Sequence, residues 1–529
     1  MTTNRPGFLR PSLTLPRVRR DITRCPRHEF DATAHMLSKI ATLPGWLLLF
    51  IAFVINPFPG LADATFQANN NSQRVVKLRE TLDAGGEVGH FAVSPDGKVV
   101  AAVVGRSVQL WDVITGKRLQ TLTGFEKWPE LYWSPDSSRL VITRWGKAAA
   151  VWFAQQQPTE LQALDLKRKP SLISWSPDGR FLLTTHPHAL ADVWDMQKLR
   201  LRFELELKKD LTDARWNPGG SAVMTVAKDT GWKAEYKLMP RSLIQVWDAE
   251  TGAEKFTIRL KGSVEKAEFS ANGKYILTAG GWDVPELWDT TTGNLHAKLN
   301  PPWCTHENCG TNYAELSRDG SLVATGSDSW RKEIWDVVSG KFLALVEAER
   351  GDEFYIRGLS PDGRLLAVYR QHFKSWKSFA EVSSIQLYDT STGKLKVALT
   401  GRNMMWSTHQ VVWSSDSQTL VTAGGSHGYQ GKIWDVATGQ LRAGLALIVK
   451  EGWLPFIGSY LNDLDELSFH PTEPVLIGTS MKLVKFWSPL SGELLQTIAA
   501  SEARWSKTGE LLVTTSEDKK SLQLWELVH

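Results

Sequence analysis

Residues 94–112 read SPDGKVVAAVVGRSVQLWD, a Ser-Pro-Asp-Gly turn followed by an apolar run and the dipeptide Trp111-Asp112. The same order of turn, apolar run and aromatic dipeptide recurs down the chain. Further Trp-Asp copies are Trp194-Asp195, Trp247-Asp248, Trp288-Asp289, Trp335-Asp336 and Trp434-Asp435. Weaker copies are Trp152-Phe153, Tyr388-Asp389, Trp487-Ser488 and Trp525-Glu526. The chain therefore contains ten related units.

The spacing of these units predicts their fold. Successive aromatic anchors lie 38 to 53 residues apart. A repeat of about 40–45 residues that carries a Trp-Asp dipeptide is typical of one four-stranded β-propeller blade. In the first unit we expect strands at 88–93, 99–104, 107–111 and 117–122, where β-branched and aromatic residues alternate between turn signals. The sequence thus predicts an all-β propeller of about ten four-stranded blades.

The repeats resemble the WD-repeat β-propeller family, in the form that bacteria export. The resemblance covers residues 74–529 and rests on the Trp-Asp dipeptides and on the Thr-Gly or Ser-Gly pairs that follow many of them. The glycines of those pairs are Gly252, Gly293, Gly340, Gly393, Gly439 and Gly492. The Gly-His dipeptide that begins each unit in the family is largely missing here. The resemblance implies a scaffold protein that catalyses no reaction.

The two ends of the array predict a closed ring. The last unit ends at 524–527, after its third strand, and an unassigned strand at 75–82 precedes the first unit. This strand matches the fourth strands of other units, such as 494–498. We expect it to complete the last blade and close the ring, which would remove exposed sheet edges. Two smaller propellers in tandem are the alternative to one ten-bladed ring.

The first 64 residues have the features of a targeting segment, and residues 65–73 form a linker to the repeats. Residues 46–55, WLLLFIAFVI, are a ten-residue apolar run. A membrane-spanning helix needs about 20 residues, whereas a run of this length suits the core of a signal peptide. We therefore expect residues 1–64 to direct export, either as a cleaved signal peptide or as a signal anchor.

Two further features fit a cleaved signal. Ala62-Asp63-Ala64 has the small-residue pattern of a cleavage site, and Met36 as the true start, in place of Met1, would give a segment of ordinary length. The predicted location is the periplasm or another extracytoplasmic space. An uncleaved segment that anchors the protein in the inner membrane is the alternative, with the arginine-rich stretch held in the cytoplasm.

Charge argues against a nucleic-acid partner. Residues 1–64 contain eight basic and four acidic side chains of the total 61 and 57, which leaves 53 of each sign in the remainder. A region with no net charge has no bulk attraction to nucleic acid or anionic lipid. We expect no nucleic-acid partner, and membrane contact only through the N-terminal segment if that segment is uncleaved.

Cysteine usage agrees with export. After the predicted cleavage point, the only cysteines are Cys304 and Cys309, in the stretch PWCTHENCG. Two cysteines in one loop of an exported protein favour a disulfide. A metal site built from Cys304, His306 and Cys309 is an alternative that lacks a fourth ligand in this segment.

Motifs for catalysis do not stand out. The sequence shows no phosphate-binding loop, nucleophile elbow or HExxH helix. The turn residues Asp96, Asp136, Asp178 and Asp362 are expected to accept backbone hydrogen bonds rather than bind a metal. His186 is expected on a solvated loop. We expect no enzyme activity, no cofactor and no metal, with an extracytoplasmic hydrolase or lyase at the central channel, or a glycan-binding propeller, as alternatives.

Long insertions predict the working face. Strands of a blade alternate in direction, so loops between second and third strands lie on the same face as the links between blades. The long inserts are of these two kinds, at 228–242, 300–312, 370–383, 401–409 and 447–463. Insertions confined to one face of a repeat protein usually mark its binding face.

These insertions contain large aromatic side chains and methionines, which suit protein interfaces. The candidate partner-binding residues are Trp232, Tyr236, Phe373, Trp376, Met405, Trp406, Trp453, Phe456 and Tyr460. The alternative is that these side chains fold down and pack over the blades. We expect a monomeric scaffold that binds a protein or peptide through this face.

Overall fold

In the computed structural model, the chain forms two compact units, residues 1–71 and 72–529. All described residues belong to the second unit: 75–125, 128–143, 148–154, 161–166, 170–186, 190–207, 211–228, 242–260, 262–280, 283–304, 311, 313–326, 330–349, 352–372, 382–400, 408–424, 430–446, 466–479 and 483–528. Within these ranges the regular structure consists entirely of strands. No helix in these ranges is long and apolar enough to cross a membrane.

The strands form ten four-stranded antiparallel sheets. Blade 1 contains β2 (Val88–Val93), β3 (Val99–Val104), β4 (Ser107–Asp112) and β5 (Arg118–Leu122). Blade 2 contains β6 (Leu131–Trp133), β7 (Arg139–Thr143), β8 (Ala148–Phe153) and β9 (Gln162–Asp165). Blade 3 contains β10 (Leu172–Trp175), β11 (Phe181–His186), β12 (Leu190–Asp195) and β13 (Arg200–Glu206). Blade 4 contains β14 (Leu211–Trp216), β15 (Ala222–Lys228), β16 (Ser242–Asp248) and β17 (Glu254–Leu260). Blade 5 contains β18 (Lys266–Phe269), β19 (Tyr275–Gly280), β20 (Asp283–Asp289) and β21 (Leu295–Lys298).

The second half of the array repeats the same arrangement. Blade 6 contains β22 (Tyr313–Leu316), β23 (Leu322–Gly326), β24 (Arg331–Asp336) and β25 (Phe342–Glu347). Blade 7 contains β26 (Glu353–Leu359), β27 (Leu365–His372), β28 (Val382–Asp389) and β29 (Leu395–Leu399). Blade 8 contains β30 (Thr408–Trp413), β31 (Thr419–Gly424), β32 (Gln430–Asp435) and β33 (Leu441–Ala446). Blade 9 contains β34 (Glu466–Phe469), β35 (Leu476–Thr479), β36 (Leu483–Trp487) and β37 (Leu494–Ala499). Blade 10 contains β38 (Ala503–Trp505), β39 (Leu511–Thr515), β40 (Ser521–Leu527) and β1 (Val76–Asp83).

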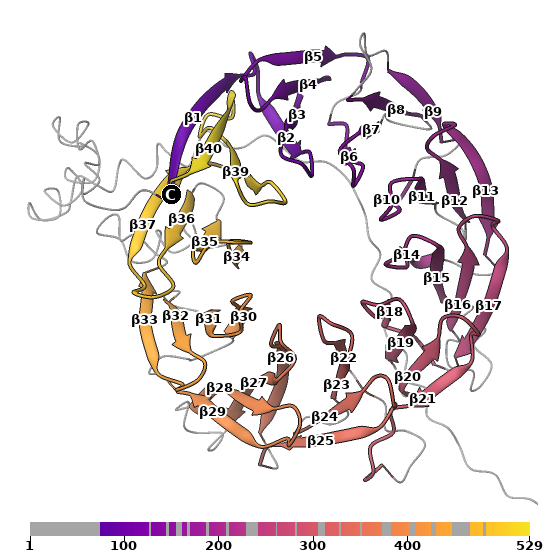
Figure 1. Cartoon of the computed structure of the whole chain (residues 1–529), viewed down its shortest axis with the longest axis vertical. Helices are drawn as coiled ribbons and strands as arrows, with labels where there is room; N and C mark the ends of the chain where they lie inside the picture. The colour runs from indigo at the N-terminus through magenta and orange to yellow at the C-terminus, as the bar shows by residue number, and fades with distance from the viewer. Residues whose placement is uncertain are drawn as a thin grey trace, which may run out of the picture. The chain divides into compact units, whose positions relative to one another are not determined.

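The blades stand around a ring in chain order, and each blade has its first strand innermost and its fourth strand outermost (Figure 1). The ring is closed by β1, which pairs antiparallel with β40 as the outermost strand of blade 10. In this pairing Val76 lies opposite Leu527 and Leu82 lies opposite Leu522. The predicted ten-bladed propeller and its closing strand are therefore both confirmed.

The hydrophobic core is divided among the contacts between blades. Ten apolar clusters each join two neighbouring blades. The cluster between blades 10 and 1 packs Val513, Leu522 and Leu524 against Val100 and Ala102. Because a cluster of this kind joins every pair of neighbouring blades, including blades 10 and 1, the structure is one propeller rather than two in tandem.

Tryptophans at the end of the innermost strands lie between blades, as the sequence predicts. Those five side chains pack against apolar clusters shared with the neighbouring blade, and they are Trp133, Trp175, Trp216, Trp413 and Trp505. Three of them donate their indole N–H to an innermost-strand carbonyl of the preceding blade. These bonds are Trp133 to Ala92 (3.3 Å), Trp175 to Tyr132 (3.0 Å) and Trp216 to Ser174 (3.1 Å).

The signature tryptophans occupy a second position, on the third strand of nine blades, where most of them are buried. Trp434 is an example, and its indole N–H donates to Thr422 Oγ1 on the neighbouring strand at 3.0 Å. The same bond joins Trp194 to Thr184, Trp247 to Thr225, Trp288 to Thr278, Trp335 to Thr325 and Trp525 to Thr514. Burial of a large aromatic side chain with its polar atom satisfied explains why this residue type recurs.

Candidate interaction surface

The ring has two edges of different construction. The short-turn edge consists of the turns from first to second strands and from third to fourth strands. The loop edge consists of the links from second to third strands and from one blade to the next. Turns from first to second strands span five residues in nine blades, beginning with 94–98, and six residues, 470–475, in blade 9. The loop edge carries every link longer than eight residues, at 229–241, 299–312, 373–381 and 447–465.

The short-turn edge is closed by its own hydrogen bonds. In the first blade Ser94 Oγ donates to Asp96 Oδ1 at 2.6 Å, and the same carboxylate oxygen accepts the Lys98 N–H at 3.1 Å. The Ser-Asp bond recurs at Ser134–Asp136, Ser176–Asp178, Ser317–Asp319, Ser360–Asp362 and Ser414–Asp416. These aspartates therefore accept hydrogen bonds within their turns, as expected for Asp in such turns.

The aspartates at the turns from third to fourth strands behave in the same way. Asp435 accepts the Thr438 N–H at 2.8 Å and bonds to the Arg442 guanidinium. The hydrogen bond from Arg442, followed by those from Thr438, lowers the pKa of Asp435 to about 2. The charge of this carboxylate is thus neutralised by its own blade rather than offered to a ligand.

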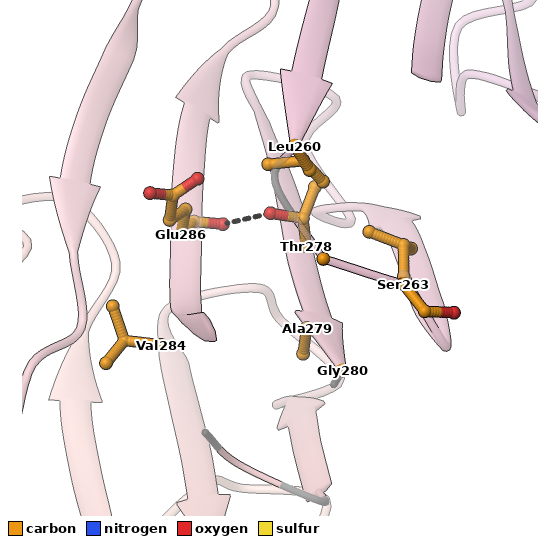
Figure 2. Close-up of a pocket in the computed structure, with 9 residues that line it drawn as sticks. Leu260, Ser263, Thr278, Ala279, Gly280, Val284 and Glu286 are labelled. Atoms are coloured by element: carbon orange, nitrogen blue, oxygen red, sulfur yellow. Dashed lines mark hydrogen bonds between the residues drawn. The ribbon is translucent and has the colours of Figure 1, made fainter. Parts of the chain in front are cut away.

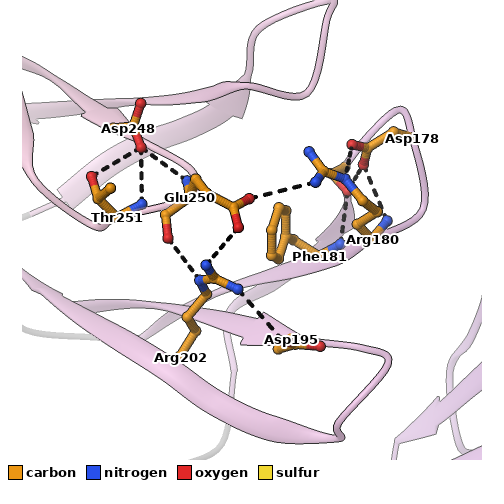
Figure 3. A network of polar contacts seen from close by, with 9 residues as sticks. Asp178, Arg180, Phe181, Asp195, Arg202, Asp248, Glu250 and Thr251 are labelled. Carbon is orange, nitrogen blue, oxygen red and sulfur yellow. Dashed lines mark hydrogen bonds and ion pairs between the residues drawn. The ribbon is translucent and has the colours of Figure 1, made fainter.

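A larger network ties blades 3 and 4 together at the short-turn edge (Figure 3). Arg202 donates to the Glu250 carboxylate at 2.7 Å and to the Glu250 carbonyl at 2.8 Å. Arg180 contacts the same carboxylate at 3.5 Å and Asp178 at 2.6 Å. Both guanidinium groups also lie over the ring of Phe181, at 5.0 and 5.2 Å from its centroid. Both arginines thus have carboxylate partners within the network, and the network connects blade 3 to blade 4.

All of the predicted partner-binding residues belong, by sequence number, to links between strands whose ends are described. The nine residues lie outside the described part of the chain, so their surface role stays a prediction: Trp232, Tyr236, Phe373, Trp376, Met405, Trp406, Trp453, Phe456 and Tyr460. Cys304, at the start of the link from blade 5 to blade 6, is disulfide-bonded. Cys309 is outside the described ranges, and its pairing with Cys304 also stays a prediction.

A small, shallow pocket opens at the loop edge between blades 4 and 5 (Figure 2). Leu260 ends β17, Ser263 lies in the link between these blades, and Gly280 and Val284 flank the link between the second and third strands of blade 5. Glu286 lines the pocket, and its carboxylate binds Lys298 Nζ at 2.9 Å. The walls are mainly apolar, and the space is no larger than about one water molecule needs.

Polar side chains also line the inner wall, the partly exposed part of the innermost strands. They occur as pairs two residues apart: Glu130 with Tyr132, Asp213 with Arg215, Lys266 with Glu268, Tyr313 with Glu315 and Glu502 with Arg504. Burial, and then the bond to the neighbouring glutamate, raises the pKa of Tyr132 well above its ordinary value. Each carboxylate in these pairs has a donor on its own strand, so the pairs do not form a convergent acidic site.

Neighbouring blades share some of these inner-wall groups. Lys266 Nζ donates to the Ala314 carbonyl of blade 6 at 2.8 Å, and Glu268 accepts the Leu316 N–H at 3.4 Å. The Lys266–Glu268 ion pair itself is 3.0 Å long. Within the described ranges, no group of three or more His, Cys, Asp or Glu side chains is placed to hold a metal ion.

One set of polar residues escaped the sequence prediction. Two positions before the signature aromatic, eight units carry a polar side chain that the structure buries: Gln109, Asp192, Gln245, Glu286, Glu333, Gln386, Lys432 and Lys485. Glu333 accepts the Thr325 hydroxyl at 2.7 Å. Burial lowers the pKa of Lys432 and of Lys485. Residues two apart on a strand lie on the same face of the sheet. A polar residue two positions before a buried tryptophan is therefore expected to be buried too, and this spacing is the signal that the sequence contains.

The prediction that His186 lies on a solvated loop is wrong. His186 is the last residue of β11, and its side chain is fully shielded from solvent. Its Nε2 lies 2.8 Å from Asp192 Oδ2 and 3.3 Å from Thr184 Oγ1, and Trp194 donates to the same Thr184 hydroxyl. Strand pairing places Thr184 opposite Asp192, which the single sequence does not reveal.

Comparison with known proteins agrees with the fold. No protein-family model matches the chain. It is 22% identical over 451 residues to the mouse WD repeat-containing protein WRAP73, covering 80% of this chain and 91% of that protein. It is 24% identical over 345 residues to the WD repeat-containing protein slp1 of Schizosaccharomyces pombe, covering 64% of this chain and 65% of that protein.

A third relative is the Xenopus laevis p21-activated protein kinase-interacting protein 1-like, 24% identical over 157 residues, which cover 30% of this chain and 38% of that protein. The repeat pattern, the ten blades and these similarities together support a WD-repeat β-propeller. The three relatives are eukaryotic, so the bacterial exported type remains a prediction.

Proposed function

We propose that this chain is a non-enzymatic scaffold that presents its loop edge to a protein or peptide partner outside the cytoplasm. The observation that carries the proposal is the difference between the two edges. Every link longer than eight residues lies on the loop edge, while the opposite edge has turns of four to six residues, many closed by internal hydrogen bonds, and a single link of eight residues at 154–161. Repeat proteins usually bind through the face that collects insertions.

The relatives support the interaction role at a general level. Two are WD-repeat proteins by name, and the third is named for its interaction with a protein kinase. The inner wall supports a binding role over a catalytic one, because its carboxylates are paired with donors on their own strands. The extracytoplasmic location rests on the apolar run at 46–55 and the Ala62-Asp63-Ala64 pattern.

The test is to shorten the loop edge without disturbing the blades. Residues 229–241 and 447–465 would each be replaced by a short Gly-Ser linker, and the proteins retained by wild type and variant would be compared quantitatively. A matched control carries Lys98→Glu and Arg364→Glu, two highly exposed side chains on the short-turn edge. The proposal expects the loop variant to lose partners that the control keeps. Equal retention by both variants would overturn it.

A further inference from the structure

Arg357 occupies an irregular position on the innermost strand of blade 7. The pairing of β26 with β27 shifts between Ile356 and Gly358, so Arg357 is the extra residue of a β-bulge. Gly358 has a φ of +126°, a backbone conformation that side-chain-bearing residues rarely adopt. Bulges next to functional sites often serve to redirect a side chain. The bulge thus gives Arg357 an orientation that a regular strand would not.

Among the described residues, no carboxylate forms an ion pair with the Arg357 guanidinium. Its Nε is buried and has no hydrogen-bond partner. Across the described part of the chain, neither a hydrogen bond nor an ion pair involves Arg357, although its guanidinium lies 5.4 Å from the centroid of the Tyr369 ring. The other inner-wall arginines differ, because Arg215 binds Asp213 at 2.7 Å and Arg504 binds Glu502 at 3.3 Å.

The half-buried guanidinium of Arg357 destabilises the protein when no ligand is bound. Burial lowers the pKa of Arg357, and the phenol groups of Tyr369, Tyr313 and Tyr355 act in the opposite direction. The Tyr369 ring compensates only part of the hydration that the half-buried cation loses, because no described group accepts a hydrogen bond from its Nε. An incoming anion would restore the lost hydrogen bonds, and a guanidinium binds carboxylate or phosphate oxygens particularly well.

Two partly exposed tyrosines lie near this cation: Tyr355 pairs across the sheet with Tyr369, and both Tyr313 and Tyr355 act on Arg357 electrostatically. Tyr313 begins β22 directly after the long link 299–312, and Tyr355 lies near the same end of β26. Their side chains are 38% and 48% exposed, which is unusual for rings on the innermost strands. The Tyr313 hydroxyl binds Glu315, so that carboxylate already has a donor. Arg357 and the two rings therefore form a polar and aromatic site below the loop edge.

We propose that Arg357 anchors an anionic side chain, a carboxylate or a phosphate, on the peptide segment that the scaffold binds, with the rings of Tyr313 and Tyr355 beside it. This inference rests on the proposed function and adds the chemistry of the partner to it. Aromatic and arginine side chains together are the residue types that dominate the energetics of many protein interfaces.

The test uses the full chain and immobilised degenerate peptide pools whose central residue is fixed as glutamate, phosphoserine or glutamine. Wild type is expected to retain the glutamate or the phosphoserine pool about tenfold more than the glutamine pool, since hydrogen bonds between charged groups are strong. Whichever anionic pool is preferred identifies the source of the charge. Arg357→Met should abolish the preference. The matched control, Arg364→Met, changes a highly exposed arginine of the same blade and should keep it.

The stability of the Arg357→Met variant distinguishes a binding role of Arg357 from a structural role. Arg357→Met should unfold at the same urea concentration as wild type or a higher one, because it removes a half-buried cation without a partner. A lower midpoint, a preference that survives in Arg357→Met, or wild type that retains all three pools equally would each overturn the inference. If shortening 229–241 and 447–465 removes partners while Arg357→Met does not, the proposed function stands and this inference fails.

Discussion

The side-chain amide of Gln496 binds both polar groups of the Val76 backbone. Gln496 Oε1 accepts the Val76 N–H at 2.9 Å, and Gln496 Nε2 donates to the Val76 carbonyl at 2.9 Å. The same oxygen accepts the Val75 N–H at 3.0 Å. Gln496 belongs to the outermost strand of blade 9 and Val76 to the closing strand of blade 10. One side chain thus connects the closing strand to the neighbouring blade.

Replacement of Gln496 by alanine should weaken this closure. Val76 is fully buried, so the variant leaves its backbone groups without a partner. An unsatisfied buried polar group costs about 1–3 kcal/mol, and we expect a lower midpoint in urea unfolding followed by tryptophan fluorescence. Gln440→Ala, on an exposed turn of blade 8, is the matched control and should unfold like wild type. Equal midpoints for the two variants would contradict the role assigned to Gln496.

The tryptophan-threonine bond in the blades predicts a second effect. Thr422→Val preserves the shape of the side chain but removes the acceptor for the Trp434 N–H, which is buried. The cost should again be about 1–3 kcal/mol, measured as a lower unfolding midpoint. In blade 1 the signature Trp111 has a buried indole nitrogen without a partner in the described part of the chain, and Ala102, which pairs with Gln109, takes the strand position that Thr422 has in blade 8. Equal midpoints for Thr422→Val and wild type would contradict the role assigned to this bond.

The pKa of Asp435 predicts how stability depends on pH. Its folded value of about 2 lies below the ordinary value of 3.8, so its contribution to stability is complete above about pH 4 and is lost as the pH falls toward 2. The stability difference between wild type and Asp435→Asn should therefore be largest near neutral pH and shrink between pH 4 and 2. Urea midpoints across that range would show it, with the exposed Glu87→Gln as control. A constant difference across the range would refute this assignment.

If the protein is exported, its mature N-terminus should lie at a defined residue. If residues 1–64 act as a cleaved signal peptide, the mature protein should begin near residue 65, after Ala62-Asp63-Ala64. Mass spectrometry of the N-terminal peptide from the native host measures this directly. A membrane-bound product that retains residues 46–55 would support the anchor instead. A product that starts at Met1 and stays unattached to the membrane would contradict export altogether.

Most of the fold could be predicted from the sequence because each blade repeats the same local signals. The Ser-Pro-Asp-Gly turns and Trp-Asp dipeptides mark where strands begin and end, and the predicted strands 88–93 and 99–104 have the observed bounds. The closing strand was also recognisable, because it has the pattern of a fourth strand that lacks a blade. These features depend on residues close together in the chain, which a single sequence displays.

The rest depends on residues brought together from different strands or blades. His186 looked like a loop residue because its bond to Asp192 forms only when β11 pairs with β12. Arg357 could not be recognised as lacking a partner, since that requires knowledge of every side chain around it. The contact between Arg202 and Glu250 joins two blades, so the single sequence offers no pattern for it.

The most direct measurement of the central claim is site-specific photo-crosslinking of the intact protein in its native host. A benzophenone amino acid would be placed at Trp232 or Trp453 on the loop edge, and at Lys98 or Arg364 on the short-turn edge. The scaffold account predicts covalent adducts with one recurring protein from the loop-edge positions and none from the short-turn positions. Adducts with that protein from the short-turn positions alone, or from both edges equally, would contradict the account.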